Sequence, residues 1–412
     1  MSNERFSRFD EVDGVLRKNS VGYLAQNLMY VIALLTFAPA YISVPVICMV
    51  GVTFCVVPGT RDKIFCHKGS FTLLLFMLTT VIVGLVHGNF IGVGIAASFA
   101  MAIVVAFVAR ALATKQFFEK LLNCVIVSGV LGTVCCVVEK MINRKVEGYR
   151  CQAFFTNPNF FGMAIALVIL ICAYKAVTHA KCVLFYYAAA IFCAIGIYLC
   201  GSMALWLMLL IGILLLLILN HEYKLLAIFM AVVACCSIAI VLVPGIISRL
   251  GELTATIDNR VKIWDFAIEQ IQEAPWFGRG FYSYKFLYGQ MHLVRPELYK
   301  ASLSHNLVFE SLISFGIVGT MLLGLFLISF LKTIMRCHDE LKKRNHGYAV
   351  TTFIVAVCVC IACYGIIDTT IVWAPTMMVI LFIMSGIGVD ERELRHIYHA
   401  ERAERLKQNN GN

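Results

Sequence analysis

Apolar residues gather in long runs along this chain, and polar residues are confined to the segments between the runs. The runs recur from residue 21 to residue 388. Most are near the roughly 20 residues that a helix needs to cross a bilayer, and none alternates as barrel strands do. They predict twelve transmembrane helices, at residues 22–38, 41–57, 70–87, 90–113, 118–138, 159–178, 182–199, 202–219, 225–247, 305–331, 349–366 and 372–388.

One long polar insertion interrupts this pattern. Residues 248–304 form the only extended water-compatible stretch between apolar runs. We therefore expect five parts: an N-terminal tail (1–20), nine transmembrane helices (21–247), the insertion, three further helices (305–388) and a C-terminal tail (389–412). Acidic and basic residues repeat at helical spacing in the C-terminal tail, which predicts a solvent-exposed helix.

The composition agrees with an all-α integral membrane protein. Hydrophobic residues make up 60% and charged residues 14% of the 412 residues, against about 25% charged residues in a soluble domain. Nearly all of the 17 cysteines lie inside apolar runs, where cysteine acts as a small hydrophobic residue, and Cys151 is the clearest exception. Histidine and cysteine show no spacing typical of a zinc site, so we expect no metal and no cofactor.

The basic residues predict the orientation in the membrane. An even number of spans places both termini on one side, and the segments on that side carry most of the 34 lysine and arginine residues. Short loops follow the positive-inside rule, so we expect cytoplasmic termini and an insertion outside the membrane. The net charge of +10 then reflects topology and attraction to anionic lipids, rather than binding of nucleic acid.

The insertion contains a segment with helical periodicity. One face carries Val261, Trp264, Ile268 and Ile271, and the other carries Lys262, Asp265, Glu269 and Gln272. Asp258 or Asn259 can cap the start of this helix, and Pro275 ends it. The pattern predicts an amphipathic helix that lies on the outer face of the membrane or on the mouths of the spans.

Two residues, one in this helix and one just after the insertion, are candidates for chemistry on an anionic substrate. Arg260 falls in its predicted first turn, where the helix dipole disfavours a cation, so helix stability does not explain it. Together with the free N–H groups of the first turn, Arg260 can bind a substrate anion. Alternatively, Arg260 pairs with a lipid headgroup or with a carboxylate of the protein. Ser304 can cap the next span, and a helix N-terminus disfavours the charged imidazole of His305. His305 is therefore a candidate general base, or else a hydrogen-bonded interfacial residue.

Further polar residues lie on the same predicted side. Glu310 and Asp368 are carboxylates near or within spans, which makes each either functional or the partner of an exterior arginine. The basic residues of the loop before residue 158 can converge on one anion with those of the insertion. The candidates for substrate binding are Arg150, Asn159, Arg279, Arg295, Asn306 and Glu310.

Several of these residues fall in motifs that resemble the bacterial O-antigen ligase and O-antigen polymerase (Wzy-type) family. The motifs are Arg260-x3-Trp264, Pro275-Trp-Phe-Gly278-Arg-Gly280, Ser304-His305-Asn306 and Gly316-Ile-Val-Gly319, with Arg150, Thr156-Asn157-Pro158-Asn159 and Phe161-Gly162 upstream. The resemblance covers about residues 150–330 as motifs and the whole chain as topology. It implies a GT-C-like glycosyltransferase architecture.

Members of that family transfer a glycan from an undecaprenyl pyrophosphate carrier to an acceptor hydroxyl, outside the cytoplasmic membrane and without a metal. The resemblance implies that His305 activates the acceptor and that Arg260 binds the pyrophosphate. One position departs from the pattern: Met203 stands where family members commonly carry a second pyrophosphate-binding arginine. Arg150, Arg279 or Arg295 can replace that arginine, or the activity is altered.

The expected function is polymerisation of surface polysaccharide repeat units in the bacterial inner membrane. The expected partners are a lipid-linked glycan donor, a glycan acceptor and membrane lipids, with a chain-length regulator or a flippase as further candidates. A ligase that attaches the finished glycan to another acceptor remains open. A transporter would require repeated halves and broken spans with charges near their middle, whereas this chain has only eight prolines. A non-catalytic scaffold is favoured only by Met203.

Overall fold

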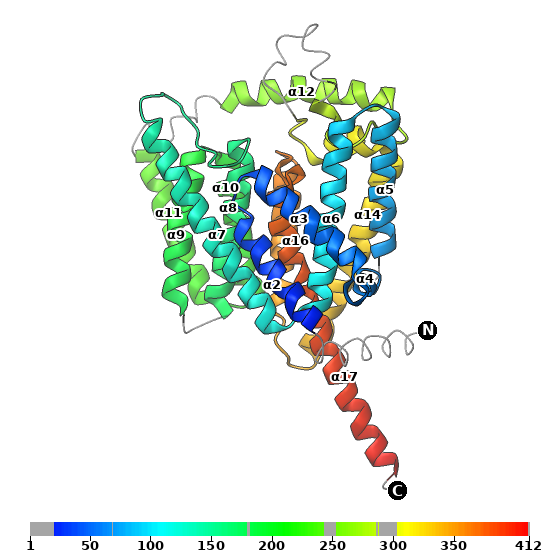
Figure 1. Ribbon diagram of the computed structural model, residues 1–412. Coiled ribbons are helices and arrows are strands. Elements are labelled where there is room, and N and C mark those ends of the chain that lie inside the picture. Colours follow the sequence, from blue (N-terminus) through cyan, green and yellow to red (C-terminus); the bar gives the residue numbers. More distant parts are fainter. Residues whose placement is uncertain are drawn as a thin grey trace.

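The computed structural model describes residues 20–67, 69–178, 182–242, 253–285, 287 and 303–410. Every regular element within these ranges is a helix, as predicted. Most helices stand side by side in a bundle, while α12 crosses one end of it and α17 projects from the other end (Figure 1). Arg295, one of the predicted substrate-binding residues, lies outside the described ranges.

Each predicted apolar span overlaps one helix of the bundle. These helices are α2 (Ser20–Leu35), α3 (Ala40–Val56), α5 (Ser70–Val86), α6 (Phe90–Leu112), α7 (Lys115–Ile142), α8 (Pro158–Thr178), α9 (Val183–Cys200), α10 (Met203–Leu219), α11 (Tyr223–Leu242), α14 (Leu307–Lys343), α15 (Ala349–Gly365) and α16 (Ala374–Ser385). The remaining elements are α4 (Pro58–Ile64), α12 (Leu253–Glu273), η4 (Thr370–Val372) and α17 (Ile387–Asn410).

The helices differ in whether they are long enough to cross a membrane. Within the described residues, six helices are long and apolar enough: α6, α7, α8, α9, α14 and the continuous pair α16–α17. The pair α3–α4, bent by 98°, is a further candidate. Helices α5, α10 and α15 are apolar but have 17 residues each, or about 26 Å, against about 30 Å of hydrocarbon. A multi-pass membrane protein is confirmed, whereas twelve crossings remain a prediction.

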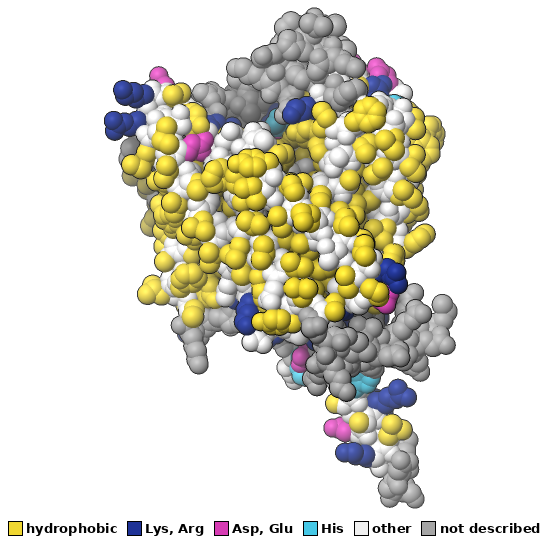
Figure 2. All heavy atoms as spheres, in the orientation of Figure 1, with side chains coloured by type: hydrophobic (Ala, Val, Ile, Leu, Met, Phe, Trp, Pro, Cys, Tyr) yellow, Lys and Arg dark blue, Asp and Glu magenta, His cyan; other side chains and the backbone are white. Residues whose placement is uncertain are grey.

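An apolar belt surrounds the bundle. Figure 2 shows hydrophobic side chains covering the side of the molecule, with charged side chains near its two ends. Large apolar residues in this belt are strongly exposed, among them Leu184 at 82% and Val86 at 77%. Such a surface is unfavourable in water but matches the hydrocarbon of a bilayer, because lipid tails are as apolar as the side chains.

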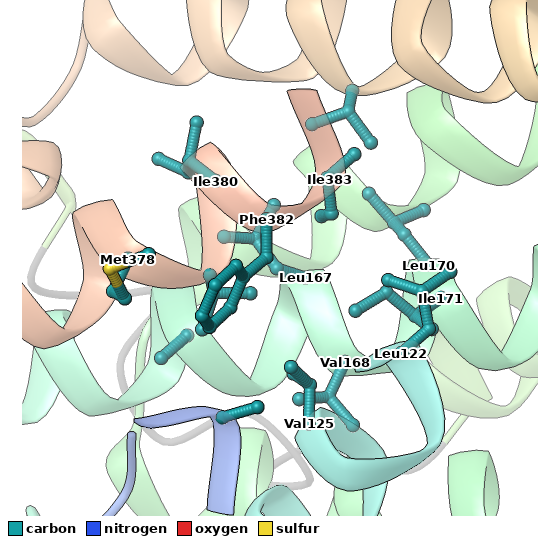
Figure 3. Packing of buried hydrophobic residues seen from close by; sticks show 14 of the residues in the cluster. Leu122, Val125, Leu167, Val168, Leu170, Ile171, Met378, Ile380, Phe382 and Ile383 are labelled. Atoms are coloured by element: carbon teal, nitrogen blue, oxygen red, sulfur yellow. The ribbon is translucent and has the colours of Figure 1, made fainter. Parts of the chain in front are cut away.

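The core forms around α8, which is apolar on every side. Of an 18-residue apolar stretch of α8, 89% is buried inside the protein. Figure 3 shows Leu167 and Val168 of α8 between Val125 of α7 and the α16 residues Phe382 and Ile383. A helix without a polar face belongs in the interior. Because α8 is central, its N-terminal end lies in the middle of the end of the bundle that α12 crosses. We call this end the mouth of the bundle.

A kink in α14 joins the insertion to the bundle. Gly316 has φ 61° and ψ −170° inside this helix, which frees backbone groups for other partners. The segment 275–280, just after α12, binds them: the Gly280 amide donates to the Ser314 carbonyl (2.8 Å), and the Ile317 amide donates to the Pro275 carbonyl (2.8 Å). The glycine motifs noted in the sequence thus form one unit that holds α12 in place.

Replacing Gly278 by Ala is expected to destabilise the protein strongly. Its φ is +64°, and an added Cβ would lie 2.6 Å from the Gly316 nitrogen. Backbone strain of this kind costs on the order of 1–3 kcal/mol, and the steric overlap adds to it. Thermal unfolding of the purified protein should show a lower midpoint. The control is Gly324→Ala, where a Cβ meets nothing within 4 Å; equal midpoints for the two variants would refute the role of this contact.

The start of α12 was predicted wrongly. The helix begins at Leu253, so Asp258 and Asn259 lie inside it rather than at its cap, and Arg260 is not in the first turn. The anion site built on free N–H groups at Arg260 is therefore wrong. Residues 253–257 contain neither glycine nor proline, so nothing stops the helix from starting before the acidic residue that resembled a cap.

The buried face of α12 also differs from the predicted one. Ile263, Phe266 and Ala267 pack against α14, whereas Val261 and Ile268 are 47% and 43% exposed. Of the predicted face, Trp264 and Ile271 are partly buried against this cluster. Apolar residues occur around most of this helix, so hydrophobicity alone could not select the side that meets the bundle.

The C-terminal helix is only partly the solvated helix that was predicted. Early in α17, Glu391 accepts two hydrogen bonds from Arg110 of α6 (2.6 and 3.0 Å), and Leu394 is buried. Glu401 accepts a hydrogen bond from Arg344 at the end of α14 (3.0 Å). Arg110 is only 6% exposed, and a buried guanidinium needs a carboxylate. The need for this partner brings the first turns of α17 back to the bundle.

Candidate active site

His305 forms a pair with Asp368 at the mouth of the bundle. The Nδ1 atom of His305 lies 3.0 Å from Oδ1 of Asp368. The histidine side chain is 22% exposed and the aspartate 4% exposed. An imidazole nitrogen that faces a carboxylate carries the proton, which leaves Nε2 to accept a proton from a hydroxyl group. This geometry suits a general base.

The carboxylate of Asp368 is held by further donors. The side-chain amide of Asn159 donates to Oδ2 (2.7 Å), and the backbone N–H of Thr369 donates to Oδ1 (2.8 Å). Burial alone would raise the pKa of Asp368, but His305, the Thr369 N–H and the charge of Arg260 together lower it below its ordinary value. Asp368 is therefore ionised near neutral pH and can stabilise a protonated imidazole.

Arg150 extends this network across the mouth. Its Nη2 donates to Oδ1 of Asn159 (2.5 Å), and its Nε donates to the carbonyl of Cys200 at the end of α9 (2.8 Å). Met203 begins α10 only three residues after Cys200. The guanidinium of Arg150 thus binds the turn just before Met203, the position at which the family resemblance implies an arginine. Through Asn159, Arg150 is also linked to Asp368.

Arg260 binds the turn after α15 that contains Asp368. Helix α12 carries it over the mouth, and its Nη1 donates to the carbonyl of Ile367. The adjacent residue is Asp368, whose partner is His305. The structure therefore brings Arg260 and His305 to consecutive residues of one turn after α15. That they face one another across a cavity remains a prediction.

The backbone at His305 is strained and held by its neighbours. His305 has φ 51°, a conformation that costs a non-glycine residue on the order of 1–3 kcal/mol. Trp264 Nε1 donates to the Ser304 carbonyl (3.1 Å), Glu310 accepts from the Ser304 N–H (3.0 Å), and Asn306 donates to the main chain after α15 (3.1 Å). These bonds fix the loop on three sides, so the imidazole is oriented before any substrate binds.

Asn306, and not Ser304, caps α14. Its Oδ1 accepts from the backbone N–H groups of Val308 (2.9 Å) and Phe309 (3.2 Å). Ser304 instead donates its hydroxyl to the Asn306 carbonyl (3.0 Å). The predicted cap was wrong because the left-handed turn at His305 delays the helix by two residues.

The other predicted site residues have different surroundings. Glu310 is 3% exposed, and its Oε1 has no hydrogen-bond partner among the described residues. Arg279 binds Glu273 (2.5 Å) and Gln270 (3.2 Å) of α12 rather than the turn at Asp368. Cys151, the predicted exterior cysteine, is fully buried. Within the described ranges, no group of His, Cys, Asp or Glu side chains is arranged to hold a metal ion.

A family model described as O-antigen ligase matches residues 188–324. This part of the chain is similar to the O-antigen ligase family. The resemblance inferred from the motifs is confirmed, and it supports a glycosyltransferase-like membrane enzyme. The matched residues include Arg260, His305 and the α14 kink, whereas Arg150, Asn159 and Asp368 lie outside them. No curated protein matches the chain.

Proposed function

We propose that this protein polymerises the repeat units of a bacterial surface polysaccharide. It transfers a glycan from an undecaprenyl pyrophosphate carrier to a sugar hydroxyl of the acceptor, at the outer face of the cytoplasmic membrane. The observation that carries this proposal is the His305–Asp368 pair, which meets Arg260 at the turn after α15. Arg260 and His305 lie within the residues that match the O-antigen ligase family. Transfer of the finished glycan to a different acceptor, as in a ligase, is the alternative.

The distribution of charge supports this orientation. The helix ends remote from α12 carry basic residues: Lys63 ends α4, Arg110 ends α6, Lys175 ends α8, and Lys342 and Lys343 end α14. Basic residues in short loops favour the cytoplasmic side. The opposite end, with α12 and the site, then faces outward, both termini are cytoplasmic, and the twelve apolar helices each cross the bilayer.

In the proposed reaction, His305 and Asp368 act on the acceptor. The hydroxyl oxygen attacks the anomeric carbon of the donor glycan while its proton passes to Nε2 of His305. Asp368, 3.0 Å from Nδ1, stabilises the imidazolium that forms. The bond between the anomeric carbon and the pyrophosphate oxygen breaks, and the prenyl pyrophosphate leaves with the electron pair.

Arginine side chains act on the leaving group. Charge develops on the pyrophosphate as the bond breaks, and fixed guanidinium groups in a partly buried site stabilise it. Arg260 and Arg150 are both half-buried, and each is oriented by a bond to a backbone carbonyl, Ile367 for the first and Cys200 for the second. The two guanidinium groups therefore need little reorganisation when charge develops on the pyrophosphate.

The proposal is tested with the purified protein in nanodiscs and a lipid-linked repeat unit as the substrate. Polymerisation gives a ladder of longer glycans that remain on the carrier, seen on a gel, and His305→Ala and Arg260→Ala should each abolish it. Transfer only to an added acceptor of another kind would identify a ligase. If the wild-type protein yields neither product, the enzymatic proposal fails, and a transporter or a scaffold takes its place.

The position of Arg150 leads to a rescue experiment. Arg150→Ala is expected to lower the transfer rate by about tenfold to a hundredfold, because one cation near the leaving group is lost while Arg260 remains. Adding Met203→Arg should restore part of the rate, since residue 203 starts α10 just beyond the Cys200 carbonyl that Arg150 binds. Initial rates of the two variants and of Met203→Arg alone decide the point; a double variant no faster than Arg150→Ala would exclude substitution of one arginine for the other.

A further inference from the structure

A second feature of the outer end is an apolar cavity. It measures about 340 Å³ and lies between α3, α6 and the start of α16. Its walls include Val44 of α3, Ile91 and Gly94 of α6, Tyr282 after α12, and Trp373 before α16. This volume is within the range of about 300–1,000 Å³ that is typical of ligand pockets. The lining is almost entirely hydrocarbon or aromatic, which suits an apolar ligand.

The cavity is open toward the apolar belt. Ile91 is 72% exposed, and its neighbour Phe90 is also 72% exposed. A Cβ added to Gly94 would meet nothing within 4 Å, so the space in front of this residue is free. In a bilayer, this part of α6 faces lipid. A hydrocarbon chain can therefore enter from the membrane without passing through water.

Two residues of the cavity wall lie close to groups of the candidate active site. Trp373 follows Asp368 by five residues, and its ring stacks on Phe160, the neighbour of Asn159 (5.5 Å between centroids, 11° between planes). Tyr282 is near Glu310: burial first, and then the charge of Glu310, raise the pKa of Tyr282 to about 12. Trp373 and Tyr282 thus connect one part of the cavity wall to the groups that hold Asp368 and the loop of His305.

We propose that this cavity binds the first isoprene units of the donor's polyprenyl chain. The proposal rests on the proposed function. In that reaction, the bond that breaks joins the glycan to the prenyl pyrophosphate, so the donor's hydrocarbon begins one pyrophosphate away from the reacting carbon. The acceptor's lipid is separated from its reacting hydroxyl by at least one sugar. A hydrocarbon site that adjoins the catalytic residues therefore fits the donor and not the acceptor.

The test fills the cavity and measures binding directly. Gly94→Leu places a side chain in the free space, and leucine is favoured over glycine inside a helix. Equilibrium binding of radiolabelled undecaprenyl pyrophosphate to the full-length protein in nanodiscs should weaken by about tenfold, the loss of a few buried methylene contacts. Val44→Trp, on the opposite wall, should weaken it similarly. Gly324→Leu on α14, where the space is also free, is the matched control and should bind as the wild type does.

Two further measurements separate this inference from the proposed function. His305→Ala should bind the radiolabelled prenyl pyrophosphate as tightly as the wild type, because the cavity is intact. Gly94→Leu should raise KM for an undecaprenyl-linked donor without changing kcat, and should leave a donor that carries a methyl group in place of the prenyl chain unaffected.

Each outcome has one meaning. Binding that is unchanged in both Gly94→Leu and Val44→Trp overturns the proposed cavity. Displacement of the radiolabel by phospholipid as effectively as by prenyl pyrophosphate also overturns it, since the site would then hold an acyl chain. If the wild type binds the prenyl pyrophosphate, loses binding on Gly94→Leu and yet transfers no glycan, the cavity is supported while the proposed function fails.

Discussion

Replacing His305 by Ala is expected to lower the rate of glycan transfer by about 10² to 10⁴, the usual contribution of a positioned general base. The acceptor hydroxyl is a poor nucleophile, and Nε2 of His305 is the nitrogen left to receive its proton, because Nδ1 faces Asp368 at 3.0 Å. Initial rates with a purified lipid-linked donor give the effect directly. The loss should lie in kcat, with little change in donor KM, because the imidazole acts on the acceptor.

Two controls make this prediction specific to the imidazole. His396→Ala changes a histidine of α17, at the other end of the bundle, and should leave the rate unchanged. His305→Gln keeps a hydrogen-bonding side chain of similar reach but provides no base, so it should be as slow as the alanine variant. A His305→Gln variant with wild-type rate would show that His305 only binds substrate.

The helical fold could be predicted because its signal is local. Each apolar run is read from its own residues, and the runs overlap the helices of the bundle one by one. The errors occur where tertiary contacts decide. The buried side of α12 depends on how this helix meets Ile313 and Tyr284, and the first turns of α17 are held by the distant Arg110. Neither partner is visible from the local pattern.

The site was predictable to the same extent. Arg260 stood out because a cation at the predicted helix start needed a reason, His305 because it follows a predicted cap, and Arg150 because it lies in a second basic loop on the same side. Asp368 stood out as a costly carboxylate near a span, but its partner is 63 positions away in the sequence, and nothing local pairs the two. The link through Asn159, which joins the start of α8 to the turn after α15, likewise depends on α8 being central.

The strain at His305 explains why its surroundings contain so many hydrogen bonds. The left-handed backbone of His305 is unfavourable, and the bonds from Trp264, Glu310 and Asn306 maintain it. Trp264 belongs to α12, whose position depends on the backbone pairing of segment 275–280 with the α14 kink. The motifs that carry the family resemblance are thus mechanically connected: the glycines place α12, and α12 places both Arg260 and the loop of His305.

Asp368→Asn is expected to reduce the transfer rate nearly as much as loss of His305, by about 10² to 10⁴. The amide has the shape of the carboxylate, but its NH₂ group can donate to Nδ1, which favours the tautomer with its proton on Nε2. That tautomer cannot accept a proton from the acceptor. Rates for Asp368→Asn and for Asp265→Asn, an exposed residue of α12, give the comparison. Binding of prenyl pyrophosphate should be the same in both, which separates a loss of chemistry from a loss of structure.

The difference in stability between the wild type and Asp368→Asn should depend on pH. The pKa of Asp368 is lowered in the folded protein, so its ionised form stabilises the fold above the unfolded-state pKa of about 3.9. This contribution is lost as the pH falls through the folded-state value. Thermal unfolding should therefore show the wild type more stable than Asp368→Asn at pH 6, with the difference shrinking below about pH 4. A difference that stays constant from pH 6 to pH 3 would mean that the carboxylate charge does not hold this turn, and that Asp368 acts through its shape alone.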